Sequence, residues 1–281
     1  MTAAALPCAS PPGPALQRAW GSARVHLRGE GEGARLDRLF QQGSAKVRFP
    51  AARGLGEAVL INTAGGMAEG DRFEWSARID GPGRACLTTQ ACEKIYGGRD
   101  LAAEAPAQAA VDLTVEGGGR LDWLPQETIL FNRANLKRTL DAELGADGEL
   151  LACEAVILGR RAMGEFPAEA RLHDRWRIRR RRRLIFADDL KLEGLLAPLS
   201  GPKALLGGAG AYASVLLAAP DAEDRIDAIR ALLPQGCGAS AWEGKLFCRL
   251  LAKDGLALRR ILIPLLTALR DGRPLPRLWT I

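Results

Sequence analysis

Residues 62–96 read NTAGGMAEGDRFEWSARIDGPGRACLTTQACEKIY, and this stretch decides the fold. From Phe73 to Ile79, apolar residues alternate with polar ones, which is the period of a β-strand with one face in water. Glycines at 65, 66 and 70 indicate a tight polar turn before that strand, since glycine adopts positive φ angles that side chains disfavour. The pattern predicts strands joined by glycine turns.

A second strand follows in the same stretch, from Arg84 to Thr88, after the turn Gly81-Pro82-Gly83. A glycine turn between two short strands predicts a β-hairpin. The next residues, up to Tyr96, crowd hydroxyls, an amide and a Glu-Lys pair at the strand end. Such a cluster is either a functional site or a hydrogen-bonded loop junction, and the residues alone leave both interpretations open.

The same alternation predicts further short strands at residues 23–27, 46–49, 58–61, 111–115, 121–123, 128–131 and 136–144. Residues 150–158 fit either a buried strand or a helix turn, and Gly145 and Gly148 predict a hairpin-like connection before them. Helices are expected at 222–233, capped by Asp221, and at 252–270, broken at Pro264 because proline lacks a backbone N–H.

These elements predict a single, mainly β domain of many short strands, with a few helices near the C-terminus. Residues 1–22 are rich in Ala, Pro and Gly and predict a flexible tail, because they bury too little surface to offset the entropy of ordering. The folded domain is expected to span residues 23–281. Its sequence has no repeat of fixed period.

The composition describes a basic protein with 281 residues, a net charge of +6 and a pI near 9.2. A basic surface favours acidic partners, whether protein or nucleic acid. The six cysteines show no regular framework, which favours reduced thiols in a cytoplasmic protein. No apolar run approaches the length of a membrane span, and the N-terminus lacks the features of a signal peptide, so neither a membrane partner nor export is expected.

The unbroken run Arg179 to Arg183 is the strongest charge feature of the sequence. A nucleic-acid-binding protein that uses this run is the alternative functional hypothesis. Single-strand binders usually combine basic residues with stacking aromatics, and here only Trp176 lies close in sequence. The run is therefore expected to form a solvated strand or loop face, with no nucleic acid bound.

Sequence motifs for enzyme chemistry are missing. The chain has no glycine-rich loop closed by Lys-Ser/Thr, no Gly-x-Ser-x-Gly elbow, and no CxxC or HxxxH pair. The histidines are His26 and His173, both in strand-like segments, and a hydrolase would need one of them beside a nucleophile. The chain is therefore expected to be a scaffold or binding protein and not an enzyme.

Four segments resemble the signature segments of the urease accessory protein UreD (UreH) family, and they occur in the family's order and spacing. They are GGMAEGD (65–71), TTQACEKIY (88–96), WLPQETILF (123–131) and LGRRAMGE (158–165). The resemblance covers the chain from about Ala23 onward. It implies an irregular, β-helix-like arrangement of strands, and a non-catalytic maturation factor that helps to install nickel in urease. The implied partners are apo-urease, the helical accessory protein UreF and the GTPase UreG.

The resemblance also supplies candidate site residues, which would form a polar path or a partner-binding surface. They are Asp71, Thr88, Thr89, Gln90, Lys94, Tyr96, Gln126, Glu127, Arg160 and Glu165. Cys92 and Gly97 depart from the family pattern, which puts any role for them in doubt. No tightly bound cofactor is expected.

Carboxylates beside the glycine turns either satisfy backbone donors of their loops or line a path for nickel. Ni²⁺ accepts oxygen ligands, and a path that passes an ion along must hold it weakly. The weak candidates for transient nickel contact are Glu69, Asp71, Glu127 and Glu165.

Overall fold

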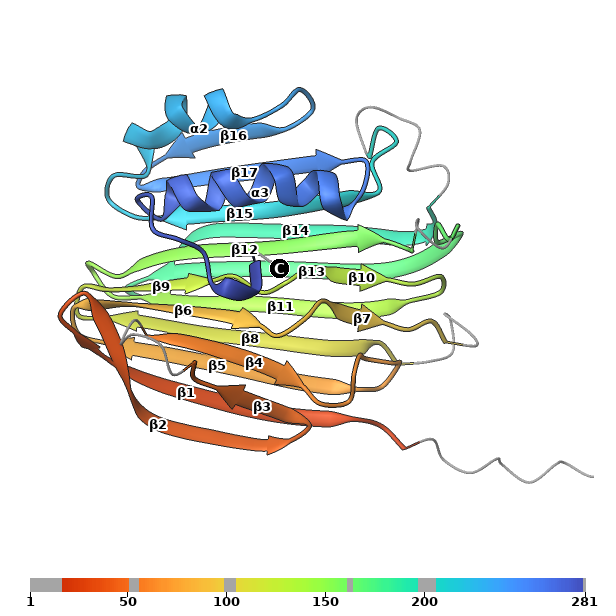
Figure 1. The fold of residues 1–281 in the computed structure, drawn as a ribbon, viewed down its shortest axis with the longest axis horizontal. Helices are drawn as coiled ribbons and strands as arrows, with labels where there is room; N and C mark the ends of the chain where they lie inside the picture. The colour runs from red at the N-terminus through yellow and green to blue at the C-terminus, as the bar shows by residue number, and fades with distance from the viewer. Residues whose placement is uncertain (1–16, 51–55, 99–104, 161–163, 197–205, 280–281) are drawn as a thin grey trace, which may run out of the picture.

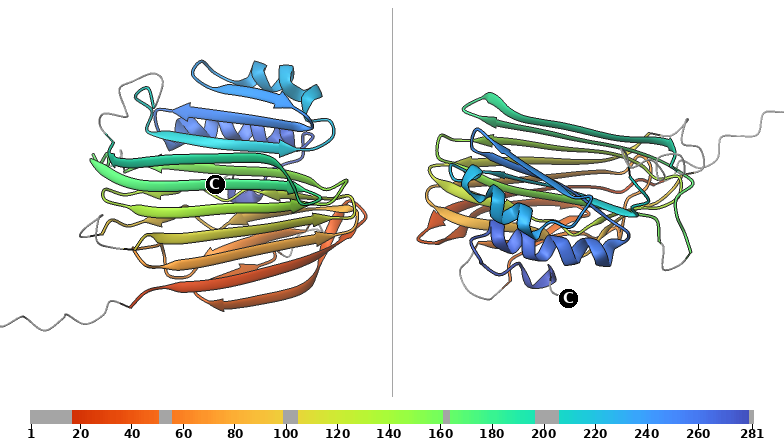
Figure 2. Two further views of the ribbon diagram at one scale, coloured as in Figure 1. Left: turned by 180° about the vertical axis from the view of Figure 1, so that it is seen from behind. Right: turned by 90° about the horizontal axis from the view of Figure 1, so that it is seen from above.

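The computed structural model describes residues 17–50, 56–98, 105–160, 164–196 and 206–279, whose strands form two sheets that lie face to face (Figures 1 and 2). The seven-stranded sheet contains, in spatial order, β14 (Arg183–Leu195), β13 (Glu169–Arg180), β11 (Asn135–Leu144), β8 (Ala107–Glu116), β5 (Arg72–Asp80), β1 (Trp20–Glu30) and β2 (Gly33–Gly43).

The ten-stranded sheet follows the order β16 (Gly238–Trp242), β17 (Lys245–Ala252), β15 (Ala211–Ala218), β12 (Glu149–Leu158), β9 (Gly119–Trp123), β6 (Gly83–Thr89), β4 (Glu57–Asn62) and β3 (Ala45–Arg48). Two short strands complete it. β10 (Thr128–Leu130) pairs with β12 and with β7 (Glu93–Ile95).

The chain passes from one sheet to the other and back, and each coil adds a parallel strand to both. Strands β5, β8, β11 and β13 are successive parallel neighbours in one sheet. Strands β6, β9 and β12 are their counterparts in the other. This coil confirms the β-helix-like arrangement of a mainly β chain.

Both hairpins expected from glycine turns are wrong. β5 and β6 flank the turn at 81–83 but belong to different sheets, and so do β11 and β12 around the turn at 145–148. The turns are real, but each one carries the chain across the core and does not fold a strand back onto its neighbour. β5 and β6 instead pair in parallel with β8 and β9 of the next coil.

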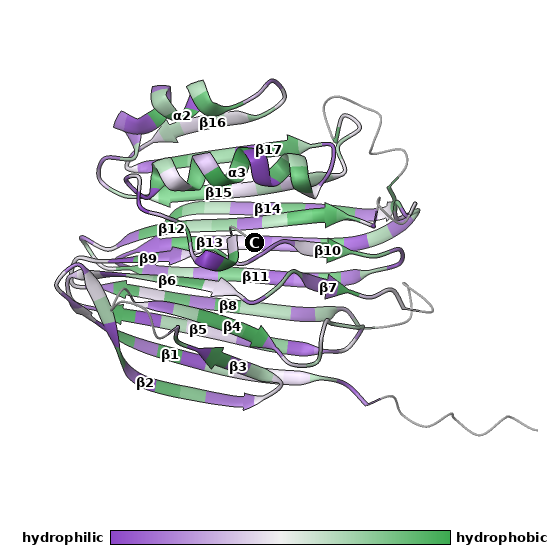
Figure 3. Ribbon diagram, in the orientation of Figure 1, coloured by the Kyte–Doolittle hydropathy of each residue, from purple (hydrophilic) through white to green (hydrophobic). Residues whose placement is uncertain are grey.

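The core between the sheets is built from the inward residues of each strand. β13 shows the pattern most clearly, because buried and half-buried residues alternate along most of its length, and the same alternation appears as bands of colour in Figure 3. β12 is buried on both faces because helices cover the outer face of its sheet, which settles residues 150–158 as a strand. β1 begins at Trp20, inside the expected tail, and residues 1–16 lie outside the described part.

The helices lie on the outer face of the ten-stranded sheet (Figure 2). They are α2 (Ile226–Leu232), α3 (Gly255–Leu269) and the 3-10 turns η2 (Glu223–Arg225) and η3 (Arg277–Trp279). The expected cap at Asp221 is wrong, because no side chain caps η2 or α2 and this carboxylate pairs with Arg225.

α3 is continuous through Pro264, so the expected break is also wrong. Buried leucines on both sides of the proline, among them Leu262 and Leu266, pack on the ten-stranded sheet, and this packing outweighs the lost hydrogen bond. Asp254 caps the first turn by accepting a 2.8 Å hydrogen bond from the Ala257 N–H. Within the described residues, no helix is long and apolar enough to cross a membrane.

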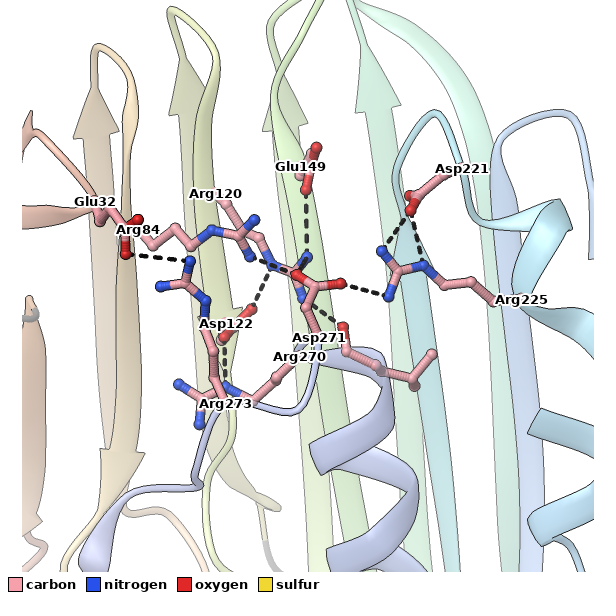
Figure 4. A network of polar contacts seen from close by, with 11 residues as sticks. Glu32, Arg84, Arg120, Asp122, Glu149, Asp221, Arg225, Arg270, Asp271 and Arg273 are labelled. Carbon is pink, nitrogen blue, oxygen red and sulfur yellow. Dashed lines mark hydrogen bonds and ion pairs between the residues drawn. The ribbon is translucent and has the colours of Figure 1, made fainter. Parts of the chain in front are cut away.

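A network of ion pairs fixes the C-terminal end of α3 to the ten-stranded sheet (Figure 4). Arg120 on β9 is buried and donates to the Leu269 carbonyl at 2.6 Å and to Asp122 at 3.1 Å. The other oxygen of Asp122 accepts from Arg270 at 2.8 Å. Asp271 joins Arg84 and Arg225 at 3.0 and 2.7 Å. Positive and negative groups alternate in this network, which holds the end of α3 on the sheet. We refer to these ion pairs as the structural tie.

Candidate functional site

The four signature segments meet at the end of the coil opposite to this tie. Met67 forms a parallel bridge with Ile95, Ile95 pairs with Leu130, and Leu130 pairs with Leu158. All four side chains are buried. One residue from each segment thus occupies four successive positions of a single ladder, so segments up to about 90 residues apart form one surface.

Asp71 organises the turn that leads into β5. Its Oδ1 accepts from the Ala19 N–H at 2.7 Å and its Oδ2 accepts from the Ala68 N–H at 2.8 Å. Both oxygens therefore satisfy backbone donors, as the structural interpretation of this residue expects.

Glu69, two residues earlier, is different. It is 2% exposed, and within the described part of the chain neither carboxylate oxygen has a hydrogen-bond partner. The chain at Gly98 passes so close that a Cβ there would lie 1.6 Å from Oε2 of Glu69. A buried carboxylate without a donor is costly, so Glu69 is the group here that would gain most from a cation or a donor.

The hydroxyls and amide of the second and third segments line the same end. Thr89 accepts from the Gln126 N–H at 2.8 Å and donates to the Ala91 carbonyl at 3.0 Å. The Thr88 hydroxyl and the Gln126 Nε2 are buried without a partner. Gln90 is exposed. These contacts describe a loop junction that retains spare hydrogen-bonding capacity.

Glu127 is held by a residue far away in sequence. It is 1% exposed, and its oxygens accept from Arg259 on α3 at 2.6 and 2.9 Å. Cys92 donates its thiol to the same carboxylate at 3.3 Å. Burial raises the pKa of Glu127, but the Arg259 hydrogen bonds outweigh it and hold the pKa below its ordinary value. Glu127 is therefore an ionised anchor for α3.

Glu93 lies in a pocket of about 290 Å³ lined by residues 60–62, 65–66, 75 and 89–94. Its carboxylate accepts from Asn62 Nδ2 at 3.1 and 3.2 Å. Burial raises the pKa of Glu93 to about 7, and the negative charge of Asp71 adds to the shift. Glu93 can thus take up or release a proton near neutral pH, a property the sequence did not reveal.

We expect Glu93 to make stability depend on pH. Its folded pKa is raised, so its contribution is fully present below the unfolded value near 4.5 and is lost as the pH rises through about 7. Glu93→Gln should remove this dependence. The free energy of unfolding of Glu93→Gln, relative to that of wild type, should therefore be about 1 to 3 kcal/mol higher at pH 8 than at pH 5. Urea denaturation at several pH values measures it.

The exposed Glu30→Gln is the matched control, because its side chain is 70% exposed. It should leave the slope of stability against pH unchanged. If wild type and Glu93→Gln gave parallel curves between pH 5 and 8, the raised pKa of Glu93 would be wrong.

The rim of this end carries aromatic and charged side chains. Tyr96 contacts Phe131 edge to face at 5.2 Å, and Arg160 stacks over the same ring at 4.6 Å. Arg160 also pairs with Glu165 at 2.5 Å, and Glu165 accepts from the Asn132 N–H at 3.0 Å. The fourth segment is therefore joined to the third through Phe131 and Asn132.

Lys94 of the second segment and Gly97, which directly follows it, complete the rim. Lys94 is exposed. Gly97 passes so close to the third segment that a Cβ there would lie 1.9 Å from the Asn132 carbonyl oxygen. Any side chain at this position would force the two segments apart, which explains the glycine.

A buried ion cluster lies deeper, between the two sheets. Arg138 on β11 pairs with Glu154 on β12 and with Asp174 on β13, both at 2.5 Å. It also donates to the Thr128 hydroxyl at 3.0 Å, and the Trp123 indole donates to Glu154 at 2.9 Å. Burial raises the pKa of Glu154. A buried ion cluster thus lies within the apolar core, next to the signature end.

Comparison with known proteins decides the family. The model of the UreD urease accessory protein family matches residues 19–280. The chain belongs to the UreD family. The UreD protein of Rhizobium rhizogenes is 48% identical over 268 residues, which cover 94% of this chain and 96% of the relative. The UreD protein of Rhizobium johnstonii is 49% identical, over 88% of this chain and 90% of the relative. The UreD protein of Agrobacterium fabrum is 43% identical, over 94% of this chain and 92% of the relative.

UreD proteins are accessory proteins, so this chain is not a catalytic enzyme. Both histidines lie beside carboxylates. Both ring nitrogens of His26 face carboxylates, Asp37 at 3.1 Å and Asp80 at 2.6 Å. His173 Nε2 lies 3.0 Å from Asp189. These contacts lie on the outer face of the seven-stranded sheet.

The four nickel candidates do not converge on one ion. Asp71, Glu127 and Glu165 each satisfy a protein partner, and only Glu69 lacks one. In the described part of the chain, no three His, Cys, Asp or Glu side chains are placed to hold a metal ion.

The arginine run occupies the turn between β13 and β14. Arg179 pairs with Asp141 at 3.4 Å and Arg180 donates to the Ala146 carbonyl at 2.7 Å. Arg181 and Arg182 adopt positive φ at the turn and are exposed, as is Arg183. Part of the run is thus engaged with the neighbouring coil, at the end away from the signature ladder.

Proposed function

We propose that this chain is a urease maturation factor that acts in the cytoplasm, binds apo-urease together with UreF and UreG, and assists nickel entry into the urease active site. The UreD match over residues 19–280 carries the proposal. The geometry supports it, because the four signature segments meet on one ladder at one end of the coil. Nickel is a transient cargo in this account, and the chain retains none.

Glu69 is the residue through which the nickel role is best tested. Its oxygens are buried and no described residue donates to them, so a passing cation would relieve an unfavourable charge. Glu69→Gln removes the charge without removing a contact, so folding and complex assembly should be preserved. Alanine at Asp71 or Glu127, by contrast, also removes hydrogen bonds that hold the fold.

We expect Glu69→Gln to lower the rate of nickel incorporation into purified apo-urease by about tenfold, equivalent to about 1.4 kcal/mol. The measurement is metal content and urease activity after incubation with nickel, bicarbonate, UreF, UreG and this chain. Asp71→Asn, Glu127→Gln and Glu165→Gln extend the series to the other candidates. Glu30→Gln, exposed and remote from the signature end, is the control.

Co-purification separates the two halves of the proposal. If Glu69→Gln assembled with the partners and all four candidate variants delivered nickel at the wild-type rate, the nickel path would be refuted while the scaffold role stood. If the wild-type chain neither bound apo-urease nor raised its nickel content, the maturation role itself would be refuted.

A further inference from the structure

A row of polar side chains that includes Arg72, Lys137 and Lys191 crosses the outer face of the seven-stranded sheet at the signature end. Arg72 on β5 is followed by Gln108 on β8, Lys137 on β11, His173 on β13 and Lys191 on β14, each the register partner of the next. Neighbouring strands lie about 4.8 Å apart, so Lys137 and Lys191 are separated by roughly 10 Å across the sheet. No helix among the described residues covers this face (Figure 2).

The row borders a pocket of about 230 Å³. Lys137, Arg171, His173 and Lys191 line it, opposed by the single carboxylate of Glu193. Lys137 and Lys191 are exposed, and among the described residues no carboxylate lies within 4 Å of either ammonium group. Arg171 lies 3.8 Å from Glu193 and His173 lies 3.0 Å from Asp189, so Lys137 and Lys191 are the positive charges of the pocket that the described residues do not neutralise.

The pocket adjoins the signature ladder through the backbone. The Arg171 N–H donates to the Ala134 carbonyl at 2.8 Å, and Ala134 pairs with Gly97 at the end of the second segment. A partner seated on the signature end would thus reach the pocket without crossing a strand.

The outward positions next to the row carry Arg175 as well as acidic residues, so the basic charge does not continue along the strands as an unbroken track. Glu74 follows Arg72 on β5, and Asp189 lies beside Lys191 on β14, each two residues along its strand. In the outward row after that, Asp112 on β8 and Asp141 on β11 are register partners. A nucleic-acid backbone needs a continuous basic track, whereas a short acidic segment of a protein needs only one row.

We propose that this pocket and row form a docking site for an acidic segment of a protein partner, with a partner carboxylate between Lys137 and Lys191. Charge complementarity carries the assignment, because a partner carboxylate would supply the negative charge that the exposed Lys137 and Lys191 lack. The site is distinct from the candidate nickel residues, and its occupancy requires neither nickel nor urease.

The test is the binding of a fluorescein-labelled decaglutamate peptide by fluorescence anisotropy at low salt. We expect Lys137→Glu/Lys191→Glu to weaken binding at least about tenfold, with wild-type binding itself reduced at 150 mM salt, where the Debye length is about 8 Å. Lys137→Gln/Lys191→Gln should lie between. The control Arg181→Glu/Arg182→Glu makes the same change in net charge at the far end of β13 and should stay within about threefold of wild type.

Three results would overturn the proposal. An equal loss in the Arg181→Glu/Arg182→Glu control would show that binding follows net charge and not this site. No wild-type binding at low salt would show that the row does not hold carboxylates. A decathymidylate bound at least as tightly, and lost equally in Lys137→Glu/Lys191→Glu, would assign the surface to nucleic acid.

Discussion

Arg138→Met should destabilise this protein by about 3 to 5 kcal/mol, because it leaves two buried carboxylates without their shared cation. Glu154 and Asp174 are 3% and 4% exposed, and each lies 2.5 Å from the guanidinium of Arg138. Methionine restores much of the apolar volume, so the loss would report the charge and not a cavity. Urea denaturation followed by tryptophan fluorescence measures the change, since Trp123 and Trp176 lie in the same core.

Two variants identify the cause. Arg138→Met/Glu154→Gln/Asp174→Asn removes all three charges and should recover most of the lost stability, since a neutral replacement of a buried ion network is often near neutral overall. Arg175→Met is the matched control on β13, because its partner Asp141 is 28% exposed, and it should cost below about 1 kcal/mol. A loss in Arg138→Met no larger than in Arg175→Met would show that the cluster does not hold the sheets together.

The cluster also shows what the strand period reveals when it is followed residue by residue. Arg138 lies between the inward residues Leu136 and Leu140, and Asp174 lies between the inward residues Leu172 and Trp176. A charge at an inward position of a strand predicts a buried ion pair, because an unpaired one is too costly. The signal was therefore present in the sequence, although only the sheet register shows that the two residues meet.

The local strands were predictable, but their partners were not. A strand with one face in solvent and one in the core alternates polar and apolar residues, so the alternation in residues 73–79 and 111–115 identifies β5 and β8 correctly. The glycine turn at 81–83 looks the same whether it closes a hairpin or carries the chain to a second sheet. The choice depends on pairing with the previous coil, which no local pattern encodes.

The candidate site was predictable as a set of segments and not as a set of contacts. The family resemblance selected four segments, and the coil brings them onto one ladder. Within the second segment it did not single out Glu93 as a candidate, because the raised pKa of Glu93 comes from burial in the folded pocket. It also did not select Arg259, which contacts Glu127 across 132 residues of sequence.

Arg259→Met is expected to cost about 3 kcal/mol, because it removes the cation that keeps a buried carboxylate ionised. Glu127 is 1% exposed, and Arg259 supplies hydrogen bonds of 2.6 and 2.9 Å to its two oxygens and another to Gln126. Without the guanidinium, burial would dominate and raise the pKa of Glu127, so the carboxyl would take up a proton. Thermal denaturation and native-state hydrogen exchange of α3 are the measurements, since this pair fixes the helix to the third signature segment.

The neighbouring Arg260→Met is the control for helix propensity and net charge, because Arg260 is exposed on the same turn of α3 and should change stability within about 0.5 kcal/mol. Adding Glu127→Gln to Arg259→Met removes the unpaired charge and should recover part of the loss. A further decrease in the double variant, or equal costs for Arg259→Met and Arg260→Met, would contradict an ionised Glu127 as the anchor of α3. In that case the leucines of α3 alone would hold the helix on the sheet.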